Sequence, residues 1–373
     1  MNKIILVGLV DNHHSLYKEL LTLLSLKFEK ITFLTTPKIG NQLYNNINPK
    51  VETIIDSGRV DKILKRNLNL INNHKILIMD EYYGLFIRIA KINIKCEKKI
   101  FIVHNVNKWV QKKISSNLKH FLDSFFKPHF FSQFDAFITM GPNIKEYFKS
   151  LKKDKPVFFF PFDQSSQELI NKKSSKETIN IVLPGMITEK RRDYNVVLKI
   201  IEKYYSDYPN SKIRIKFLGR IYSDKYNFVS KFSDNINKKF GKKIFYWTSF
   251  IPELEFENEI KNADFLLSNL KISSKLVNRV EIYGKTKESG ISFIIYKYEK
   301  IAIVPKSQNI LSGFDSQLIK FNCYDDLYEI FRRIEENKID INTLKINAIN
   351  NKHIFNIKIK QENVKLLKFL TKR

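Results

Sequence analysis

The chain has 373 residues, of which 43% are hydrophobic, so it is long enough and apolar enough for two domains with cores of their own. Its formal net charge of +27 favours anionic partners, including nucleic acid and acidic lipid, without choosing among them. Cys96 and Cys323 are too few for a disulfide framework and too isolated for a zinc site, which favours a reducing compartment.

The first residues resemble a signal peptide only superficially, in that Lys3 precedes the apolar run IILVGLV. The run is short, has no small-residue cleavage site and stops at polar residues, as a buried strand does. No other segment approaches the roughly 20 apolar residues that a membrane-spanning helix needs. We therefore expect a cytoplasmic protein, either soluble or peripheral at the inner face of the cell membrane.

Strand-like apolar runs alternate with helix-like periodic segments through the first half of the chain. The expected strands include residues 3–10, 30–36, 74–80, 98–105, 135–140 and 156–162, and amphipathic segments such as 15–28, 60–71 and 143–151 separate them. Continuous apolar strands between amphipathic helices indicate parallel strands that are covered on both faces. We predict that residues 1–165 form a doubly wound, Rossmann-like α/β domain.

A polar stretch between residues 163 and 178 interrupts this alternation, and we predict that residues 166–177 form a linker. The alternation then restarts, which predicts a second Rossmann-like domain over residues 178–345. A basic tail over residues 346–373 is expected to be helical and to pack back on the first domain. Two such domains form a cleft between the carboxyl ends of their strands, where open α/β sheets bind ligands.

A cationic loop follows the first expected strand of the second domain. This strand ends at Pro184-Gly185, Lys190, Arg191 and Arg192 follow, and a helix is expected to open near Asp193. Cations beside a helix N-terminus suit an anionic diphosphate, because guanidinium forks and ammonium groups neutralise its charge. The alternative is a solvated basic turn in a lysine-rich chain.

The segment YGKTKESG predicts a second anion-binding element, a helix that starts at Ser289-Gly290. The first amides of a helix have no partners within it, and glycine lets a phosphate approach them closely. Ser289 is also a suitable N-cap, and Lys287 lies just upstream. Taken alone, this segment fits an ordinary capped helix better than a phosphate site.

The order and spacing of PG…KRRDY, FLGR, ADFLLSNL and YGKTKESG resemble the nucleotide-sugar domain of GT-B glycosyltransferases, in particular the retaining glycosyltransferase family four. The resemblance implies two Rossmann-like domains that face each other across a cleft. It implies transfer of a sugar from a nucleotide-sugar donor to a glycan or lipid-linked acceptor, in cell-surface polysaccharide or glycolipid biosynthesis. It also implies a metal-independent, retaining reaction with no cofactor besides the donor.

The resemblance assigns site residues as well. Arg192, with Lys190 or Arg191, would stabilise the departing diphosphate, and His104 would contact the transferred sugar. The expected donor-binding residues are Gly8, Arg191, Gly219, Arg220, Phe250, Ile251, Lys287, Glu288, Ser289 and Gly290.

One departure from the family pattern concerns ribose recognition. The family usually carries two glutamates separated by seven residues around this helix, the second of which holds the ribose. In this chain Glu288 matches the first, but the position of the second is Tyr296. The broken pair favours an alternative function, that of a non-catalytic GT-B-like binding or partner protein.

Polar residues after the strands of the first domain are candidates for the acceptor side. They are Asp11, His13, His14, Asp80 and Glu81. A histidine near the first strand is the general base in inverting GT-B enzymes, so a catalytic role for His13 or His14 would predict inversion. For the carboxylates, solvated strand-end caps are the favoured alternative. We find no Asp-x-Asp motif and no His/Asp cluster with metal-ligand spacing, so no metal is expected.

Aromatic and basic residues mix between residues 107 and 134. The stripe Val110, Ile114, Leu118, Phe121, Leu122 and Phe125 has helical spacing and predicts a core-facing helix. The segment FFKPHFF, residues 125–131, is the expected contact with an anionic membrane. We expect no nucleic-acid partner, because no RNA-binding motif, zinc finger or helix-turn-helix signature accompanies the positive charge.

Overall fold

The first domain is built on a parallel sheet. The structure, a computed structural model, describes residues 3–11, 13–43, 48–82, 88–90, 92–110, 118–152, 154–161, 178–221, 223, 227–276 and 279–372. Seven parallel strands pair in the order β3-β2-β1-β4-β5-β6-β7. They are β1 (Ile4–Gly8), β2 (Ile31–Thr35), β3 (Val51–Ile55), β4 (Ile76–Met79), β5 (Lys98–Val103), β6 (Ala136–Thr139) and β7 (Val157–Phe159).

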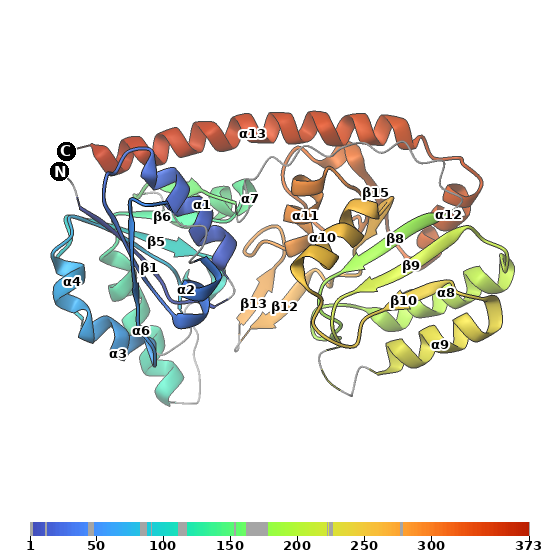
Figure 1. The fold of residues 1–373 in the computed structure, drawn as a ribbon, viewed down its shortest axis with the longest axis horizontal. Helices are drawn as coiled ribbons and strands as arrows, with labels where there is room; N and C mark the ends of the chain where they lie inside the picture. Colours follow the sequence, from blue (N-terminus) through green and yellow to red (C-terminus); the bar gives the residue numbers. More distant parts are fainter. Residues whose placement is uncertain are drawn as a thin grey trace.

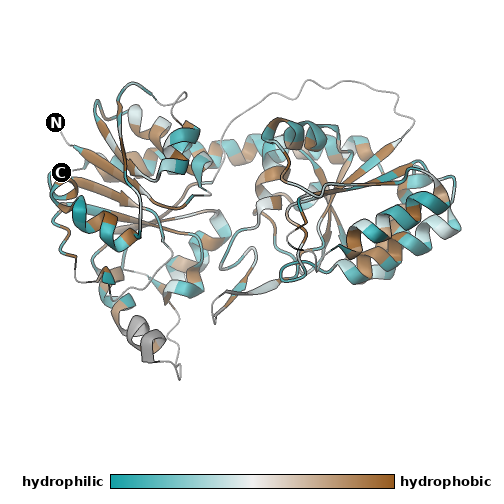
Figure 2. Cartoon of the chain, turned by 60° about the horizontal axis from the view of Figure 1, so that its bottom comes forward, coloured by the Kyte–Doolittle hydropathy of each residue, from teal (hydrophilic) through white to brown (hydrophobic). Residues whose placement is uncertain are grey.

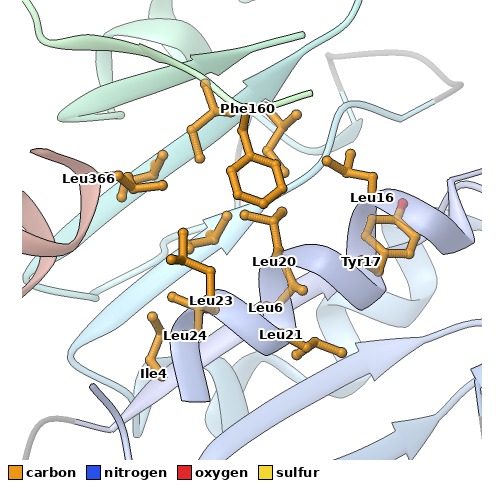
Figure 3. Packing of buried hydrophobic residues seen from close by; sticks show 14 of the residues in the cluster. Ile4, Leu6, Leu16, Tyr17, Leu20, Leu21, Leu23, Leu24, Phe160 and Leu366 are labelled. Atoms are coloured by element: carbon orange, nitrogen blue, oxygen red, sulfur yellow. The ribbon is translucent and has the colours of Figure 1, made fainter. Parts of the chain in front are cut away.

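Helices cover both faces of this sheet, because its inner strands are apolar on both sides. The helices are α1 (His14–Ser25), α2 (Pro37–Leu43), α3 (Val60–Arg66), α4 (Leu68–Asn72), α5 (Val106–Val110), α6 (Leu118–Ser132) and α7 (Pro142–Leu151). Leucines of α1 pack with Ile4 and Leu6 on one face, as Figure 3 shows. Ile5 and Val7 point to the other face, where residues of α3, α4 and α6 pack. The sequence did not suggest β3, an edge strand that is only partly buried and contains Glu52.

The second domain repeats this arrangement with six parallel strands in the order β10-β9-β8-β11-β14-β15. They are β8 (Ile179–Pro184), β9 (Ile213–Leu218), β10 (Ile244–Tyr246), β11 (Phe265–Leu267), β14 (Ile301–Pro305) and β15 (Leu318–Phe321). The helices are α8 (Tyr194–Asp207), α9 (Phe228–Phe240), α10 (Glu253–Asn262), α11 (Gly290–Tyr298), the short 3-10 helix η4 (Asp315–Gln317) and α12 (Tyr324–Glu335). An antiparallel hairpin, β12 (Ser273–Leu276) and β13 (Arg279–Ile282), was not expected and points toward the first domain (Figure 1).

Helix α13 (Ile341–Thr371) runs along both domains and brings the C-terminus close to the N-terminus (Figure 1). Phe355 and Ile359 join a hydrophobic cluster made mostly by the second domain. Leu370 joins the core of the first domain, as does Leu366, which Figure 3 shows. The helix begins at Ile341, before the start that was predicted for the tail. The predicted linker, residues 166–177, lies outside the described residues, and the domain boundaries beside it stay predictions.

The hydropathy of the chain follows this architecture, with apolar strands inside each domain and many hydrophilic residues on the outer helices (Figure 2). In each sheet the strand order reverses once along the chain, between β1 and β4 in the first domain and between β8 and β11 in the second. Loops diverge at these two switch points, and the crevice between them is the favoured binding position in open α/β sheets. Candidate site residues directly follow three of these strands, β1, β4 and β8.

Candidate functional site

A cavity of about 220 Å³ lies at the switch point of the second domain. Its wall is formed by the loop after β8, the loop after β11, and the segment that leads into α11. The lining residues are Pro184, Gly185, Met186, Thr188, Arg191, Arg192, Phe256, Ser268, Leu270, Tyr283, Lys287, Glu288, Ser289, Gly290, Ile291 and Ile294. The structure thus brings the cationic loop and the start of α11, which are distant in sequence, to one cavity.

Arg192 is held rigidly at this cavity. Its guanidinium donates to the carbonyl of Pro184 at 2.7 Å and to Oδ1 of Asn269 at 3.2 Å. Gly185 has a φ of +104°, and a Cβ at this position would overlap the guanidinium. The glycine therefore lets the arginine lie across the end of β8, where its remaining N–H groups can meet an anion.

Helix α11 begins at Gly290 with Ser289 as its N-cap, as the sequence predicted. The Ser289 hydroxyl is 2.9 Å from that of Ser292, while the Glu288 carboxylate accepts from the Ser289 amide at 3.0 Å and from the Ser292 hydroxyl at 2.8 Å. Apart from its chain neighbours and the backbone of its own helix, no atom of the described residues lies within 4 Å of the position that a Cβ of Gly290 would take. The first turn of the helix therefore has open space in front of it for a ligand.

Two ionisable groups of the cavity wall have pKa values near neutrality. Burial raises the pKa of Glu288 to about 7, although its bonds from Ser289 and Ser292 act in the opposite direction. Oε2 of Glu288 has no hydrogen-bond partner among the described residues. Burial also lowers the pKa of Lys287 to about 8, and repulsion from Arg191 adds to this.

The switch point of the first domain holds a second cluster of polar side chains, centred on Asp80 after β4. Its Oδ2 lies 2.8 Å from Nδ1 of His13 and accepts from the Tyr17 hydroxyl at 2.5 Å, and its Oδ1 lies 2.6 Å from Nε2 of His104. Burial alone would raise the pKa of Asp80, but charge and hydrogen bonds from His104 and His13 outweigh burial and hold it well below its usual range. Burial and repulsion from His104 lower the pKa of His13.

Glu81 is also buried, and its bonds fix the segment after β5. It accepts from the backbone amide of His104 at 2.9 Å, from Nδ2 of Asn105 at 2.6 Å and from Nε1 of Trp109 at 3.0 Å. Asp80 and Glu81 are each only 2% exposed, so the expectation of solvated caps is wrong. Burial would raise the pKa of Glu81. The positive charge of Lys108 and the hydrogen bonds that Glu81 accepts outweigh burial, so the pKa of Glu81 is lowered.

The two switch points face each other across the domain interface. Asn105 forms a backbone bridge with Lys287, and the amide of Val106 donates to the carbonyl of Thr286 at 2.8 Å. A Cβ on Gly141, at the start of α7, would lie 2.8 Å from Oε2 of Glu288. The segment that leads into α11 at the cavity of the second domain is therefore in direct contact with the segment after β5 in the first domain.

Comparison with solved structures agrees with this fold. An E. coli structure described as trehalose-6-phosphate bound with UDP-2-fluoro glucose matches with a TM-score of 0.66 and 10% identity, covering 100% of this chain and 99% of that one. Anabaena HepE, solved with UDP and glucose, matches with a TM-score of 0.63 and 10% identity over 100% of both chains. The UDP-forming α,α-trehalose-phosphate synthase of Burkholderia vietnamiensis matches with a TM-score of 0.64 and 7% identity, over 99% of both chains. The chain has the GT-B fold. The sequence matches no protein-family model and no curated protein.

Several residues predicted for the donor site lie outside the cavity of this GT-B chain. Lys190 and Arg220 are exposed, and the Phe250 side chain is 76% exposed. Ile251 is buried in a hydrophobic cluster, and Gly219 packs against the backbone of Gly185 at the neighbouring strand end. None of these five lines the cavity, and their proposed contacts with a donor stay predictions.

The remaining candidates of the first domain have separate places. Gly8 lies beneath the rings of Tyr17 and Phe33, where a Cβ would overlap the Tyr17 ring. Asp11 is exposed and accepts from the Thr36 hydroxyl, and His14 is the first residue of α1. Sequence reasoning missed Tyr17 and Asn105, because a tyrosine in an amphipathic helix and an asparagine after a strand carry no signal of their own.

His13, Asp80 and His104 also offer three atoms within 4.8 Å of one another, a cluster that the sequence could not show because its members are far apart in the chain. That no metal is bound stays a prediction, because it was based on spacing along the chain. Ligand atoms of a tetrahedral zinc, about 2.1 Å from the metal, would lie roughly 3.4 Å apart. The observed 2.6 and 2.8 Å separations fit hydrogen bonds to one carboxylate better.

The prediction that FFKPHFF, residues 125–131, contacts a membrane is wrong for two of its four phenylalanines. Phe130 and Phe131 are 1% and 2% exposed and stack in the core of the first domain around Trp109. Phe121, which was predicted to face the core, is 40% exposed instead. Among the described residues, no helix combines the length and apolar character that crossing a bilayer requires.

Proposed function

We propose that this GT-B chain transfers a sugar from a nucleotide-sugar donor to a glycan or lipid-linked acceptor, in the biosynthesis of a cell-surface polysaccharide or glycolipid. The observation that carries the proposal is the convergence of Arg191, Arg192, Lys287 and the first turn of α11 on one cavity. The structural neighbours solved with UDP and glucose, or with UDP-2-fluoro glucose, support a nucleotide-sugar donor.

Sugar transfer develops negative charge on the departing diphosphate while the sugar becomes oxocarbenium-like. Fixed cations and helix amides that face the diphosphate stabilise this state more than the ground state. Arg192 suits the role because Pro184 and Asn269 already hold its guanidinium in place. We propose a metal-independent reaction, since these groups supply the positive field themselves.

The stereochemical course is proposed to be retention, on the resemblance to family four. The His13–Asp80 pair favours the alternative, because a carboxylate that holds one imidazole nitrogen orients the ring and raises the basicity of the other nitrogen, which could then take a proton from an acceptor hydroxyl. Inversion would follow from direct attack by that hydroxyl. The anomeric configuration of the first-formed product, read by NMR, distinguishes the two.

The test of the donor site uses titration calorimetry with UDP-glucose and GDP-mannose, followed by an assay of donor hydrolysis and transfer. We expect binding of one donor, and a loss of turnover on the order of a hundredfold or more in Arg192→Ala, the size seen when one group that stabilises the transition-state charge is removed. Arg332→Ala is the matched control, because Arg332 pairs with Glu329 and Glu336 on α12, outside the cavity. Unchanged turnover in Arg192→Ala would contradict the mechanism.

A non-catalytic binding or partner protein is the second candidate. It is favoured by the missing ribose-binding glutamate: Tyr296 takes that position, is 2% exposed and donates its hydroxyl to Asn356 instead of lining the cavity. Failure to bind any nucleotide sugar, or binding without turnover, would support this candidate over the first.

A further inference from the structure

The outer side of α13 carries an unusual concentration of exposed apolar side chains. Five of the fourteen exposed large hydrophobic residues in the described chain lie on this one helix. They are Ile346, Ile349, Ile354, Ile357 and Val364, each 45–57% exposed. Single exposed apolar residues are normal on protein surfaces, but a group on one element indicates a contact surface.

The apolar residues share a face that points away from the protein. Ile346, Ile357 and Val364 are separated by about three and about two helical turns, so they lie in one line along the helix. The line is opposite the buried residues Phe355 and Leu366, which anchor the helix to the two domains. In Figure 1 no other element of the described chain lies above this side of α13.

Lysines lie beside this line of apolar side chains, and no exposed carboxylate lies on the helix. Exposed lysines on the helix are Lys345, Lys358, Lys360, Lys365 and Lys368. The one acidic residue between Ile341 and Thr371 is Glu362, which is buried and paired with Lys145 and Lys365. The exposed face thus carries a line of apolar side chains, with His353 between Ile346 and Ile357, and lysines on its flanks.

We propose that the outer face of α13 docks on an anionic lipid surface. A helix that lies in a membrane interface places apolar side chains between the headgroups while flanking lysines extend toward their phosphates. The charge selects this occupant, since a second copy of the chain would bring like charges together along the helix. The proposal does not depend on sugar transfer, and it places membrane contact on α13 instead of on FFKPHFF.

The test is co-sedimentation of the full chain with vesicles of phosphatidylcholine, with and without phosphatidylglycerol. We expect binding to the anionic vesicles that is at least tenfold stronger than to pure phosphatidylcholine and weaker at high salt. Ile346→Gln with Ile357→Gln, both at exposed positions, is expected to weaken binding at least fivefold, and Lys360→Glu with Lys368→Glu to do the same.

The matched control is Lys238→Glu with Lys239→Glu on α9, which changes the net charge equally at a site away from α13 (Figure 1). Binding should survive in the control. An equal loss in both charge variants would mean that overall charge attracts the protein, and would overturn the proposal. So would absence of vesicle binding, or light scattering that shows a dimer which the isoleucine variant disrupts, since that face would then join two copies.

Discussion

Lys287 and Glu288 are adjacent residues, half-buried and buried respectively, that make the charge of the cavity depend on pH. Glu288, with a pKa of about 7, is largely neutral below that pH and carries a negative charge above it. Lys287, with a pKa of about 8, is positive below that pH and neutral above it. The formal charge of the cavity therefore falls by one as pH rises through about 7, and by one more through about 8.

We expect the affinity for UDP-glucose, whose diphosphate keeps its charge over this range, to fall as pH rises from about 6 to about 9. A loss of roughly tenfold for each group corresponds to about 1.4 kcal/mol. Calorimetry across this range measures it. Glu288→Gln should remove the fall in affinity near pH 7 and leave the fall near pH 8. A pH-independent affinity in the native chain would contradict this assignment.

At the level of elements, the hairpin β12–β13 and the short helix α5 lock the two domains together. The Glu281 carboxylate, fully buried, accepts from the amide of Lys108 at 2.8 Å and from that of Asn107 at 3.3 Å. It also accepts from the Thr286 hydroxyl at 2.5 Å. A residue of the second domain thus supplies acceptors for the first amides of a helix in the first domain.

Replacing Glu281 by alanine should open the cleft, because these amides lose their acceptor while Thr286 loses its partner. We expect the free energy of docking between the two domains to weaken by about 1–3 kcal/mol. Small-angle scattering should show a larger radius of gyration. Glu335→Ala is the control: Glu335 accepts from Tyr204, Ser211 and Lys212 within the second domain, so its loss should lower stability without changing the scattering.

At the level of the whole molecule, α13 makes the two domains structurally dependent on each other. Leu370 is fully buried in the core of the first domain, although it lies close to the C-terminus, and Phe355 packs between Phe159 and Tyr296. Lys98 of the first domain donates to the carbonyl of Phe369 at 3.0 Å, which satisfies one of the last carbonyls of the helix.

Leu370→Ala should therefore destabilise the first domain, although the residue is remote in sequence. Removal of a fully buried leucine typically costs about 2–5 kcal/mol in the free energy of unfolding. Urea denaturation followed by circular dichroism measures the change. Val364→Ala is the control on the same helix: its side chain is half exposed, so we expect a change within about 0.5 kcal/mol. Equal effects of the two substitutions would mean that α13 does not anchor this domain.

The sequence alone determined the two α/β sheets, the cationic loop at Arg192 and the helix start at Ser289-Gly290, because hydrophobic periodicity and strand ends are local properties of a chain. Only the tertiary structure decided which strand ends meet: β1 lies beside β4, so His13 reaches Asp80, and Lys287 reaches Asn105 across the cleft. Which side chains are buried also depends on segments that are distant in the sequence. The same short sequence patterns occur in solvated and buried segments, and the elements that pack on Glu81 and Phe131 come from distant parts of the chain.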